Sequence, residues 1–259
     1  MPRDPRPWIS ALRSSQDHLR ALVEPLSPEQ VEASSRAREW TIAQVMSHLG
    51  SQAEIFGAIL DAALEHRPLP GPDAFPPVWD AWNARGVVDQ AADSLAVNES
   101  FVRRVEGLSD AQLGTLHFAM FGMEFDAVGF LQMRLSEHAV HTWDVAASLD
   151  PSAQVSTGAV ALLVDTLPDL ARRVGTPQGA SIRLRITTTD PVRQLLLVVD
   201  DEVRIERSDG GSADGLLRLP AEALLRLVYG RLDDEHTPPI EFAADGMTLD
   251  TLRSVFPGV

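Results

Sequence analysis

The sequence EWTIAQVMSHL, residues 39–49, contains the clearest helix start in the chain. Thr41 stands where an N-cap side chain would accept a backbone hydrogen bond, and Gln44, three residues later, completes the pattern of a capping box. Helical periodicity continues to about Glu65, where the Pro-rich segment of residues 66–77 begins. The stretch therefore predicts a long helix with a sharply defined beginning.

Three other segments of the first half show the same helical spacing of apolar residues. They cover about residues 4–24, 78–106 and 126–149, and polar or Pro-containing segments connect them. Four long helices joined in this way are typical of a four-helix bundle. We therefore expect residues 1–150 to form a bundle.

The composition changes after residue 150. The segment DPSAQVSTG is typical of a linker, and a helix is expected over about residues 158–174. Apolar residues then alternate with Arg in SIRLRITTT, residues 181–189, which is the period of a strand. Further strands are expected at 194–201, from Glu202 and at 239–246, and helices from Pro220 and over 247–256. Residues 151–259 are therefore predicted to form a small α+β domain, which makes the chain a two-domain α+β protein.

Composition excludes several kinds of function. The 259 residues carry a net charge of −15, which opposes binding to nucleic acid. No apolar run approaches the roughly 20 residues of a membrane helix, and the N-terminal sequence lacks the apolar core of a signal peptide, so we expect a cytoplasmic protein with no membrane partner. The sequence has no Cys for a disulfide or a nucleophile. All 22 basic residues are Arg, so no Lys is present to form a Schiff base.

Two side chains in RLSEHAVHTW, residues 134–143, have the spacing of metal ligands. Glu137 and His141 are four residues apart, so on a helix they lie on one face, one turn apart. His138 points about 100° away from Glu137 and is a poor ligand for the same ion. His48 is the best third ligand, because its helix carries a stripe of polar and then apolar residues typical of a pocket wall. Two His and one Glu leave a fourth position for water or substrate, as in catalytic zinc sites.

The same residues are also compatible with a bundle that binds no metal. A Glu-x-x-x-His pair is common on helix surfaces as a weak side-chain interaction, and a single His such as His48 is often half-buried and hydrogen-bonded. Gln52 either lines the open coordination position or is an ordinary polar residue, and Arg134 and Asp144 either form local pairs or orient the ligands. We expect four tryptophans to be packing anchors rather than substrate platforms: Trp40, Trp79, Trp82 and Trp143.

At these motifs the sequence resembles a known family. EWTIAQVMSHL, followed far along the chain by RLSEHAVHTWDVAASL, is similar to the actinobacterial mycothiol-dependent maleylpyruvate isomerases, which belong to the wider group of DinB/YfiT-like metal-binding four-helix bundles. The resemblance implies that His48, Glu137 and His141 are the ligands of a divalent metal, with zinc preferred.

The C-terminal stretch from Leu224 to Gly258 resembles the second domain of the same proteins, which is similar to sterol-carrier-type α+β domains. This resemblance implies that an Arg of the second domain faces the active site, and Arg231 is the candidate for that catalytic role. The alternative is an Arg near a helix end, where it interacts favourably with the helix dipole.

The resemblance also implies a reaction. Mycothiol, a sugar-linked cysteine thiol, would occupy the open metal position with Gln52 and Arg134 beside it, and its thiolate would attack a small electrophile. In the isomerase, addition to the cis double bond of maleylpyruvate, rotation and elimination give the trans isomer, whereas an S-transferase keeps the adduct. We therefore expect an isomerase or S-transferase with small-molecule partners, no nucleic acid, and a monomeric or small homo-oligomeric state. The alternative is a non-enzymatic metal-binding protein whose C-terminal domain holds a ligand or a protein partner.

Overall fold

The computed structural model describes residues 3–37, 39–120, 122–179, 181–208 and 210–258. The chain divides into two compact units, Met1–Ala159 and Val160–Val259. The division falls inside the helix α8 (Thr157–Leu163), slightly later than the boundary predicted at residue 150. Among the described residues, no helix combines the length and the hydrophobicity that a membrane span requires.

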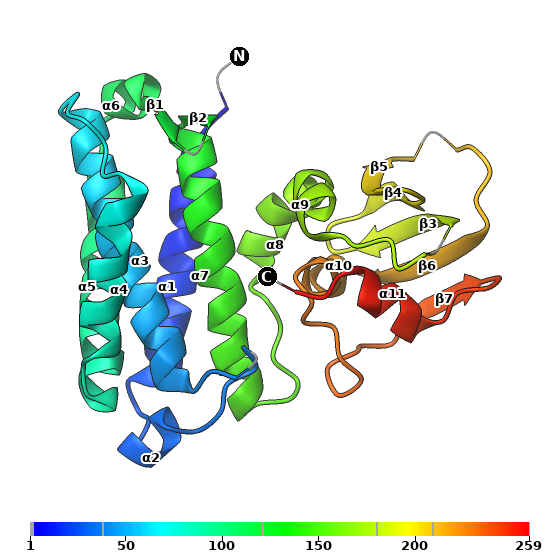
Figure 1. The fold of residues 1–259 in the computed structure, drawn as a ribbon, viewed down its shortest axis with the longest axis horizontal. Helices are drawn as coiled ribbons and strands as arrows, with labels where there is room; N and C mark the ends of the chain where they lie inside the picture. The colour runs from blue at the N-terminus through cyan, green and yellow to red at the C-terminus, as the bar shows by residue number, and fades with distance from the viewer. Residues whose placement is uncertain (1–2, 38, 121, 180, 209, 259) are drawn as a thin grey trace. The chain divides into compact units, whose positions relative to one another are not determined.

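Four long helices make up the first unit. They are α1 (Arg6–Val23), α3 (Ile42–Leu64), α5 (Val87–Glu106) and α7 (Ala127–Leu149). Helix α1 packs against α5 and α7, and α3 packs against the same two helices, so the four close into a bundle (Figure 1). The predicted four-helix bundle is therefore confirmed.

The start of α3 follows the predicted capping box. The Thr41 hydroxyl accepts a hydrogen bond from the Gln44 backbone N–H at 3.2 Å, and the Gln44 side-chain oxygen accepts one from the Thr41 N–H at 2.8 Å. Thr41 has the extended backbone of an N-cap residue. These two bonds satisfy N–H groups that have no partner inside the helix, and they fix where the polar stripe of α3 begins.

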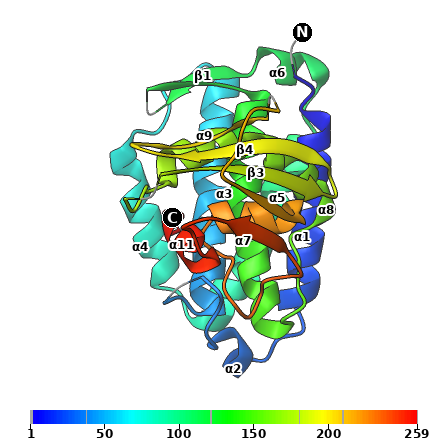
Figure 2. The ribbon, with the colours of Figure 1, turned by 90° about the vertical axis from the view of Figure 1, so that its right-hand side faces the viewer.

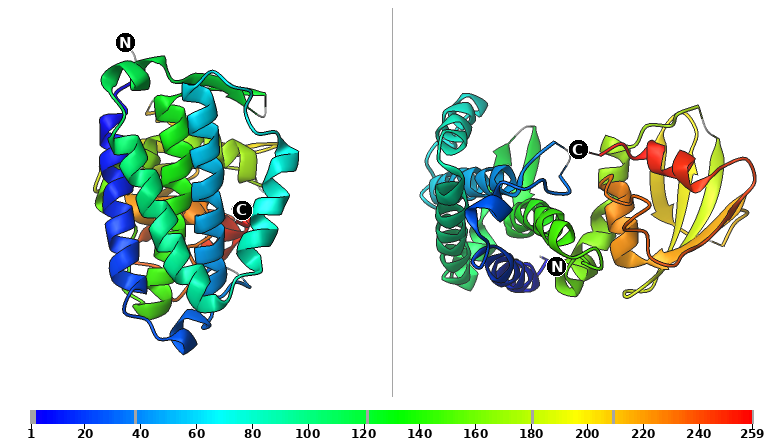
Figure 3. Two further views of the ribbon diagram at one scale, coloured as in Figure 1. Left: turned by 90° about the vertical axis from the view of Figure 1, so that its left-hand side faces the viewer. Right: turned by 90° about the horizontal axis from the view of Figure 1, so that it is seen from below.

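The helix predicted over residues 78–106 is wrong, because two helices occupy this segment. Helix α4 (Phe75–Asn83) ends before Gly86, which is the N-cap of α5. Trp82 of α4 is buried against α3, where its indole N–H donates to a Glu54 carboxylate oxygen at 2.8 Å. Any side chain at Gly50 would overlap the Trp82 ring. The close approach at Gly50 therefore holds α4 beside α3 (Figure 3, left).

Short elements close the two ends of the bundle. Helix α2 (Pro28–Val31) lies at one end, and α6 (Asp110–Thr115) lies at the other, together with the antiparallel strands β1 (His117–Met120) and β2 (Met123–Asp126) (Figure 1). The sequence prediction contained none of these elements, because each is too short to show a clear period. Strand β1 matters for the site, since Met120 reaches the cavity described below.

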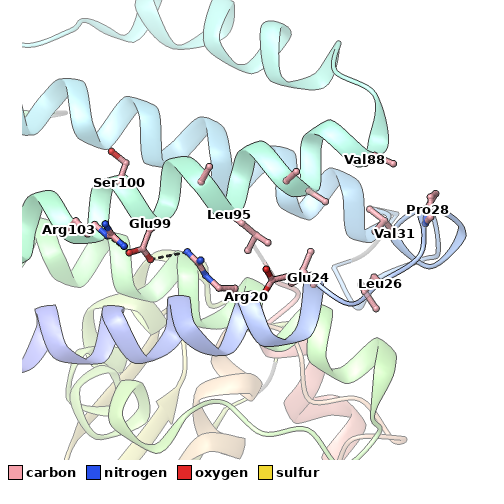
Figure 4. A pocket seen from close by; sticks show the side chains of 14 residues that line it. Arg20, Glu24, Leu26, Pro28, Val31, Val88, Leu95, Glu99, Ser100 and Arg103 are labelled. Atoms are coloured by element: carbon pink, nitrogen blue, oxygen red, sulfur yellow. Dashed lines mark hydrogen bonds and ion pairs between the residues drawn. The ribbon is translucent and has the colours of Figure 1, made fainter.

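A half-buried carboxylate joins α1 to α5. Glu99 lies 2.7 Å from an Arg13 guanidinium nitrogen and 3.0 Å from one of Arg20. Hydrogen bonds from Arg13 and Arg103 outweigh burial and lower the pKa of Glu99 to about 2. Arg20, Glu99 and Arg103 also line one end of a cavity of about 690 Å³ between α1, α2 and α5, and its remaining walls are mostly apolar (Figure 4).

Replacing Glu99 with Gln is expected to destabilise the protein by about 2 kcal/mol at pH 7, because a pKa unit corresponds to about 1.4 kcal/mol and the site is partly solvated. The folded pKa lies below the ordinary 4.5, so this stability is present above pH 4.5 and is lost as the pH falls towards 2. Urea unfolding at several pH values measures the difference. Asp17→Asn is the matched control, because Asp17 meets the same Arg13 at 3.4 Å but is 61% exposed. An equal effect of both substitutions would contradict the prediction.

The second unit contains a mixed sheet. In the described residues it has five strands in the order β5-β4-β3-β6-β7. Strands β3, β4 and β5 are antiparallel neighbours, whereas β6 runs parallel to β3 (Figure 2). The strand bounds are β3 (Ile182–Thr189), β4 (Arg193–Val199), β5 (Val203–Arg207), β6 (Gly215–Pro220) and β7 (Glu241–Ala244).

Two helices cover one face of this sheet. Helices α9 (Leu167–Val174) and α10 (Ala221–Val228) pack against each other, α9 against β5 and α10 against β3 and β6 (Figure 3, right). A further helix, α11 (Leu249–Val255), follows β7. The expected α+β class is confirmed, but strand β6 was not predicted. Its sequence GLLRLP runs directly into the helix that begins after Pro220, so the helical pattern masked the strand.

Candidate metal site

Three potential metal ligands from two helices converge inside the bundle. His48 lies on α3, and Glu137 and His141 lie one turn apart on α7. Each offers one ligand atom, and these atoms all lie within 4.8 Å of one another. The structure therefore brings together the same three side chains that the sequence motifs indicated.

The separations are suitable for one small divalent ion. A Glu137 carboxylate oxygen, Oε2, lies 3.1 Å from Nε2 of His48 and 3.8 Å from Nε2 of His141. Two ligands about 2.0–2.1 Å from a tetrahedral zinc ion lie about 3.4 Å apart, so these distances bracket the value that zinc requires. A donor set of two imidazoles and one carboxylate also suits zinc and several other divalent ions.

The protonation states of the cluster favour ligation. Burial raises the pKa of Glu137, but the hydrogen bond to His48, both imidazoles and the Gln52 amide outweigh it and lower that pKa to about 2. Burial lowers the pKa of His48 from its ordinary value, although Glu137 opposes the shift. Metal ligands must be deprotonated, so the lowered pKa values of Glu137 and His48 favour binding of a metal ion.

Asp144 fixes the orientation of His141. Its fully buried carboxylate accepts a hydrogen bond from Nδ1 of His141 at 2.9 Å. When Nδ1 carries the proton, Nε2 keeps its lone pair, and Nε2 is the atom that faces Glu137. A carboxylate behind a ligating imidazole is the usual support of a protein metal site. Of the two interpretations of Asp144, this contact supports the orienting one.

Trp40 covers the two imidazoles. Its ring centroid lies 5.1 Å from that of His48 and 5.8 Å from that of His141. Glu39, just before it, has a φ of 65°, a left-handed conformation that is uncommon for a residue with a side chain. This turn leads from the loop into the N-cap of α3 and sets the indole over the cluster. Trp40 is 36% exposed, so it packs on the imidazoles without being part of the buried core.

Gln52 and Arg134 support Glu137 from behind. The Gln52 amide donates to Glu137 at 2.8 Å, and its oxygen accepts a hydrogen bond from Arg134 at 2.9 Å. Arg134 is fully buried and also donates to the Leu49 carbonyl and to the side chain of Asn98. Arg134 therefore has no exposed surface with which to contact a cosubstrate directly, and it reaches the cluster through Gln52. The sequence spacing allowed a direct Arg134–Glu137 pair, but in the structure Arg134 acts on Glu137 through the Gln52 side chain.

His138 points away from the cluster. Its Nδ1 lies 2.8 Å from the Ser15 hydroxyl and its Nε2 lies 3.1 Å from the Gln16 side-chain oxygen, both on α1. Burial and the nearby charges of Arg134 and His141 lower its pKa well below the ordinary value. His138 is thus a neutral part of the α1–α7 contact, and it stays out of the cluster, as its helical position predicted.

A cavity of about 920 Å³ adjoins the cluster within the first unit. His48 and Gln52 form part of its wall, and the residues that complete it come from α3 and the loop before it, from α4, β1 and α7, and from Arg85 and the start of α5. Trp79 lies in this wall and is 44% exposed, whereas Trp82 and Trp143 are buried. The metal cluster therefore borders a space large enough for a small molecule.

Arg231 lies in the second unit. It follows Gly230, which has a φ of 70°, at the end of α10. Its guanidinium donates to the Tyr229 carbonyl at 2.7 Å, and its backbone N–H donates to the Arg226 carbonyl. The contact with a carbonyl at the helix end fits the helix-dipole interpretation. A catalytic role for Arg231 stays a prediction.

Sequence patterns missed several residues of the site. Asn98 anchors Arg134, but a single Asn in a helix carries no recognisable signal. Met120 and Phe75 reach the cavity from elements whose bounds were not predicted. Trp40 had one useful signal, its position directly before the N-cap of the helix that carries His48.

Comparison with known proteins identifies the fold and the family. A sequence profile described as "Mycothiol maleylpyruvate isomerase N-terminal domain" matches residues 12–146, more than half of the chain. No curated protein sequence matches.

Solved structures match over most of the chain. A crystal structure of the mycothiol-dependent maleylpyruvate isomerase matches with a TM-score of 0.65 at 13% identity, over 92% of this chain and 95% of that one. A mutant of that isomerase gives a TM-score of 0.64 at 13% identity, over 88% and 90%. YfiT from Bacillus subtilis matches less well, with a TM-score of 0.40 at 16% identity over 57% and 93%.

At these identities the structural matches show a shared fold alone, whereas the profile match shows the family. The expected resemblance is thereby confirmed over the first unit, and the expected fold over both units. The chain belongs to the family of proteins with a mycothiol maleylpyruvate isomerase N-terminal domain.

Proposed function

We propose that this protein is a divalent-metal enzyme that uses mycothiol as a thiol cosubstrate to isomerise or conjugate small electrophiles. The observation that carries the proposal is the convergence of His48, Glu137 and His141 beside a cavity of about 920 Å³. Three protein ligands leave a coordination position open, and the adjoining cavity gives a small molecule room to reach it. Membership of the isomerase family supports the thiol and the class of reaction.

The proposed ligands supply what a catalytic metal site needs. A divalent ion held there would lower the pKa of a bound thiol, so that the thiol is present as its nucleophilic thiolate. Glu137 brings the negative charge of the ligand set, and Asp144 directs Nε2 of His141 towards it. Trp40 packs over the imidazoles on one side of the cluster.

Gln52 is proposed to have two roles in this site. Its amide nitrogen donates to Glu137 and its side chain lines the cavity, so it both positions the carboxylate and borders the cosubstrate. Arg134 is proposed as a positioning residue, because its guanidinium holds the Gln52 amide oxygen. Arg231 is proposed to act on the substrate as a catalytic residue, as the family resemblance implies.

The cavity distinguishes this proposal from a non-enzymatic metal-binding protein. A structural zinc site has four protein ligands and no open position. Among the described residues, the cluster contains three candidate ligands, and His48 and Gln52 face the cavity. This arrangement favours an enzyme over a sealed structural site.

Metal content and thiol-dependent turnover test the proposal together. The protein is purified without an affinity tag, its metal content is measured by elemental analysis, and mycothiol consumption is followed with maleylpyruvate and with a neutral enone. We expect about one zinc-like ion per chain and a reaction that a chelator abolishes and zinc restores. The absence of a bound ion, with no uptake when zinc is supplied, would refute the proposal. A bound ion without thiol consumption would favour the non-enzymatic alternative.

A further inference from the structure

The cavity beside His48 has largely apolar walls. Apolar side chains of α3, α4, α7 and β1 line it, among them Ile55, Ile59, Phe75, Trp79, Met120 and Met133. Met133 is one turn before Glu137 on α7, so the apolar wall begins close to the metal cluster. A molecule that reaches the cluster must therefore place part of its surface against hydrocarbon and aromatic rings.

Cationic side chains are scarce along this wall. Among the described residues that line the cavity, Arg85 is the only Arg, and the sequence contains no Lys. The guanidinium of Arg85 lies 2.9 Å from an Asp93 carboxylate oxygen and 3.6 Å from the centroid of the Trp82 ring. Asp93 therefore balances its charge, and the Trp82 face holds it in place.

The buried Arg of the bundle does not supply the missing charge. Arg134 has no exposed surface, and its guanidinium donates to Gln52, to Asn98 and to the Leu49 carbonyl. A carboxylate placed on these walls would lose its water shell without gaining the charge-assisted hydrogen bonds that compensate for that loss.

We propose that this cavity selects neutral, conjugated electrophiles that carry an apolar group, and that it discriminates against their carboxylates. The inference rests on the proposed function, because it names the substrate class of the same site. In the reaction with such an electrophile, the thiol sulfur bonds to the β-carbon and the thiol proton ends on the α-carbon. The carbon–carbon double bond becomes single, and nothing is oxidised or reduced.

Binding of a matched pair of ligands tests the selectivity without relying on turnover. Methyl cinnamate and cinnamate have the same phenyl ring and double bond and differ in charge. Isothermal titration calorimetry on the full-length, metal-loaded protein at neutral pH is expected to give at least roughly tenfold tighter binding of the ester. Equal or tighter binding of cinnamate would overturn the inference, as would the failure of both ligands to bind.

A substitution that adds a cation should reverse the preference. Met133→Arg places a guanidinium on the cavity wall and is expected to strengthen cinnamate binding by roughly tenfold. Val88→Arg is the control for net charge, because Val88 is 51% exposed and lines the other cavity. Met133→Leu controls for loss of the methionine. A last variant, Arg85→Gln, tests whether Arg85 binds carboxylates. If the wild-type protein binds cinnamate as tightly as the ester, and Arg85→Gln abolishes that binding, then Arg85 is a carboxylate site and the inference is wrong.

Turnover separates this inference from the proposed function. Mycothiol consumption with maleylpyruvate but not with methyl cinnamate would support the proposed function and overturn the neutral selectivity. If the protein binds the ester tightly but consumes mycothiol with none of the electrophiles, the selectivity is supported and the proposed enzymatic function is refuted. Consumption with the ester at higher kcat/KM than with cinnamate is the result that both proposals expect.

Discussion

Removing a ligand from the cluster is expected to abolish metal binding and, with it, thiol-dependent activity. Glu137→Gln keeps the shape of the side chain but removes its charge, and His141→Ala removes the imidazole that Asp144 orients. Loss of a residue that only supports a ligand costs about 10–100-fold in metal affinity, so loss of a ligand itself should cost more than about 100-fold. Elemental analysis and competition with a fluorescent chelator measure the affinity.

The strand pair β1–β2 offers matched controls for these substitutions. His117 and Glu124 form an exposed His–Glu pair 3.6 Å apart, with side chains 64% and 66% exposed. Glu124→Gln and His117→Ala repeat the same chemical changes where the described residues form no three-ligand cluster. We expect both controls to retain wild-type metal content. A Glu137→Gln protein that stays folded and binds metal as tightly as its control would contradict the assignment of the site.

Arg134→Met is expected to cause the largest loss of stability. The substitution removes a buried charge and leaves the side-chain oxygens of Gln52 and Asn98 without the donor that Arg134 supplies. The Leu49 carbonyl also loses Arg134 but keeps the Asn98 amide as a donor. Burial lowers the pKa of Arg134 to about 10, so the guanidinium is still charged at neutral pH. Breaking a buried, hydrogen-bonded charge network typically costs about 3–5 kcal/mol, and urea unfolding at pH 7 should show a loss of this size.

An exposed Arg of the same bundle provides the comparison. Arg104 on α5 is 44% exposed and lies 3.0 Å from Asp61 of α3. Arg104→Met should cost less than about 1 kcal/mol, because exposed ion pairs contribute little. The loss of stability caused by Arg134→Lys should lie between those of Arg134→Met and Arg104→Met, because Lys keeps the charge and some hydrogen-bond donors. If the free energy of unfolding of Arg134→Met is within about 1 kcal/mol of the wild-type value, the buried network does not stabilise the bundle.

Local patterns predicted most of the helices of the bundle. The capping box at Thr41 and Gln44 is made by atoms three residues apart, so the sequence contains everything that defines it. The same holds for Glu137 and His141, whose separation follows from one helical turn. The break between α4 and α5 was missed because its cause is not local. Trp82 packs onto Gly50, far away in the sequence, and this contact gives α4 its own direction.

The sequence by itself determined the class of the fold, the helices that carry the ligands, and the identities of His48, Glu137 and His141 as candidates. Tertiary structure alone decided that the three ligand atoms lie within 4.8 Å of one another. It also decided that Arg134 is buried behind Gln52 and that the cavity wall is apolar. The physical reason is that helical spacing is a property of a few consecutive residues, whereas burial and convergence depend on the packing of α3, α4 and α7. That packing is set by contacts between residues far apart in the sequence, and these contacts leave no periodic signal in it.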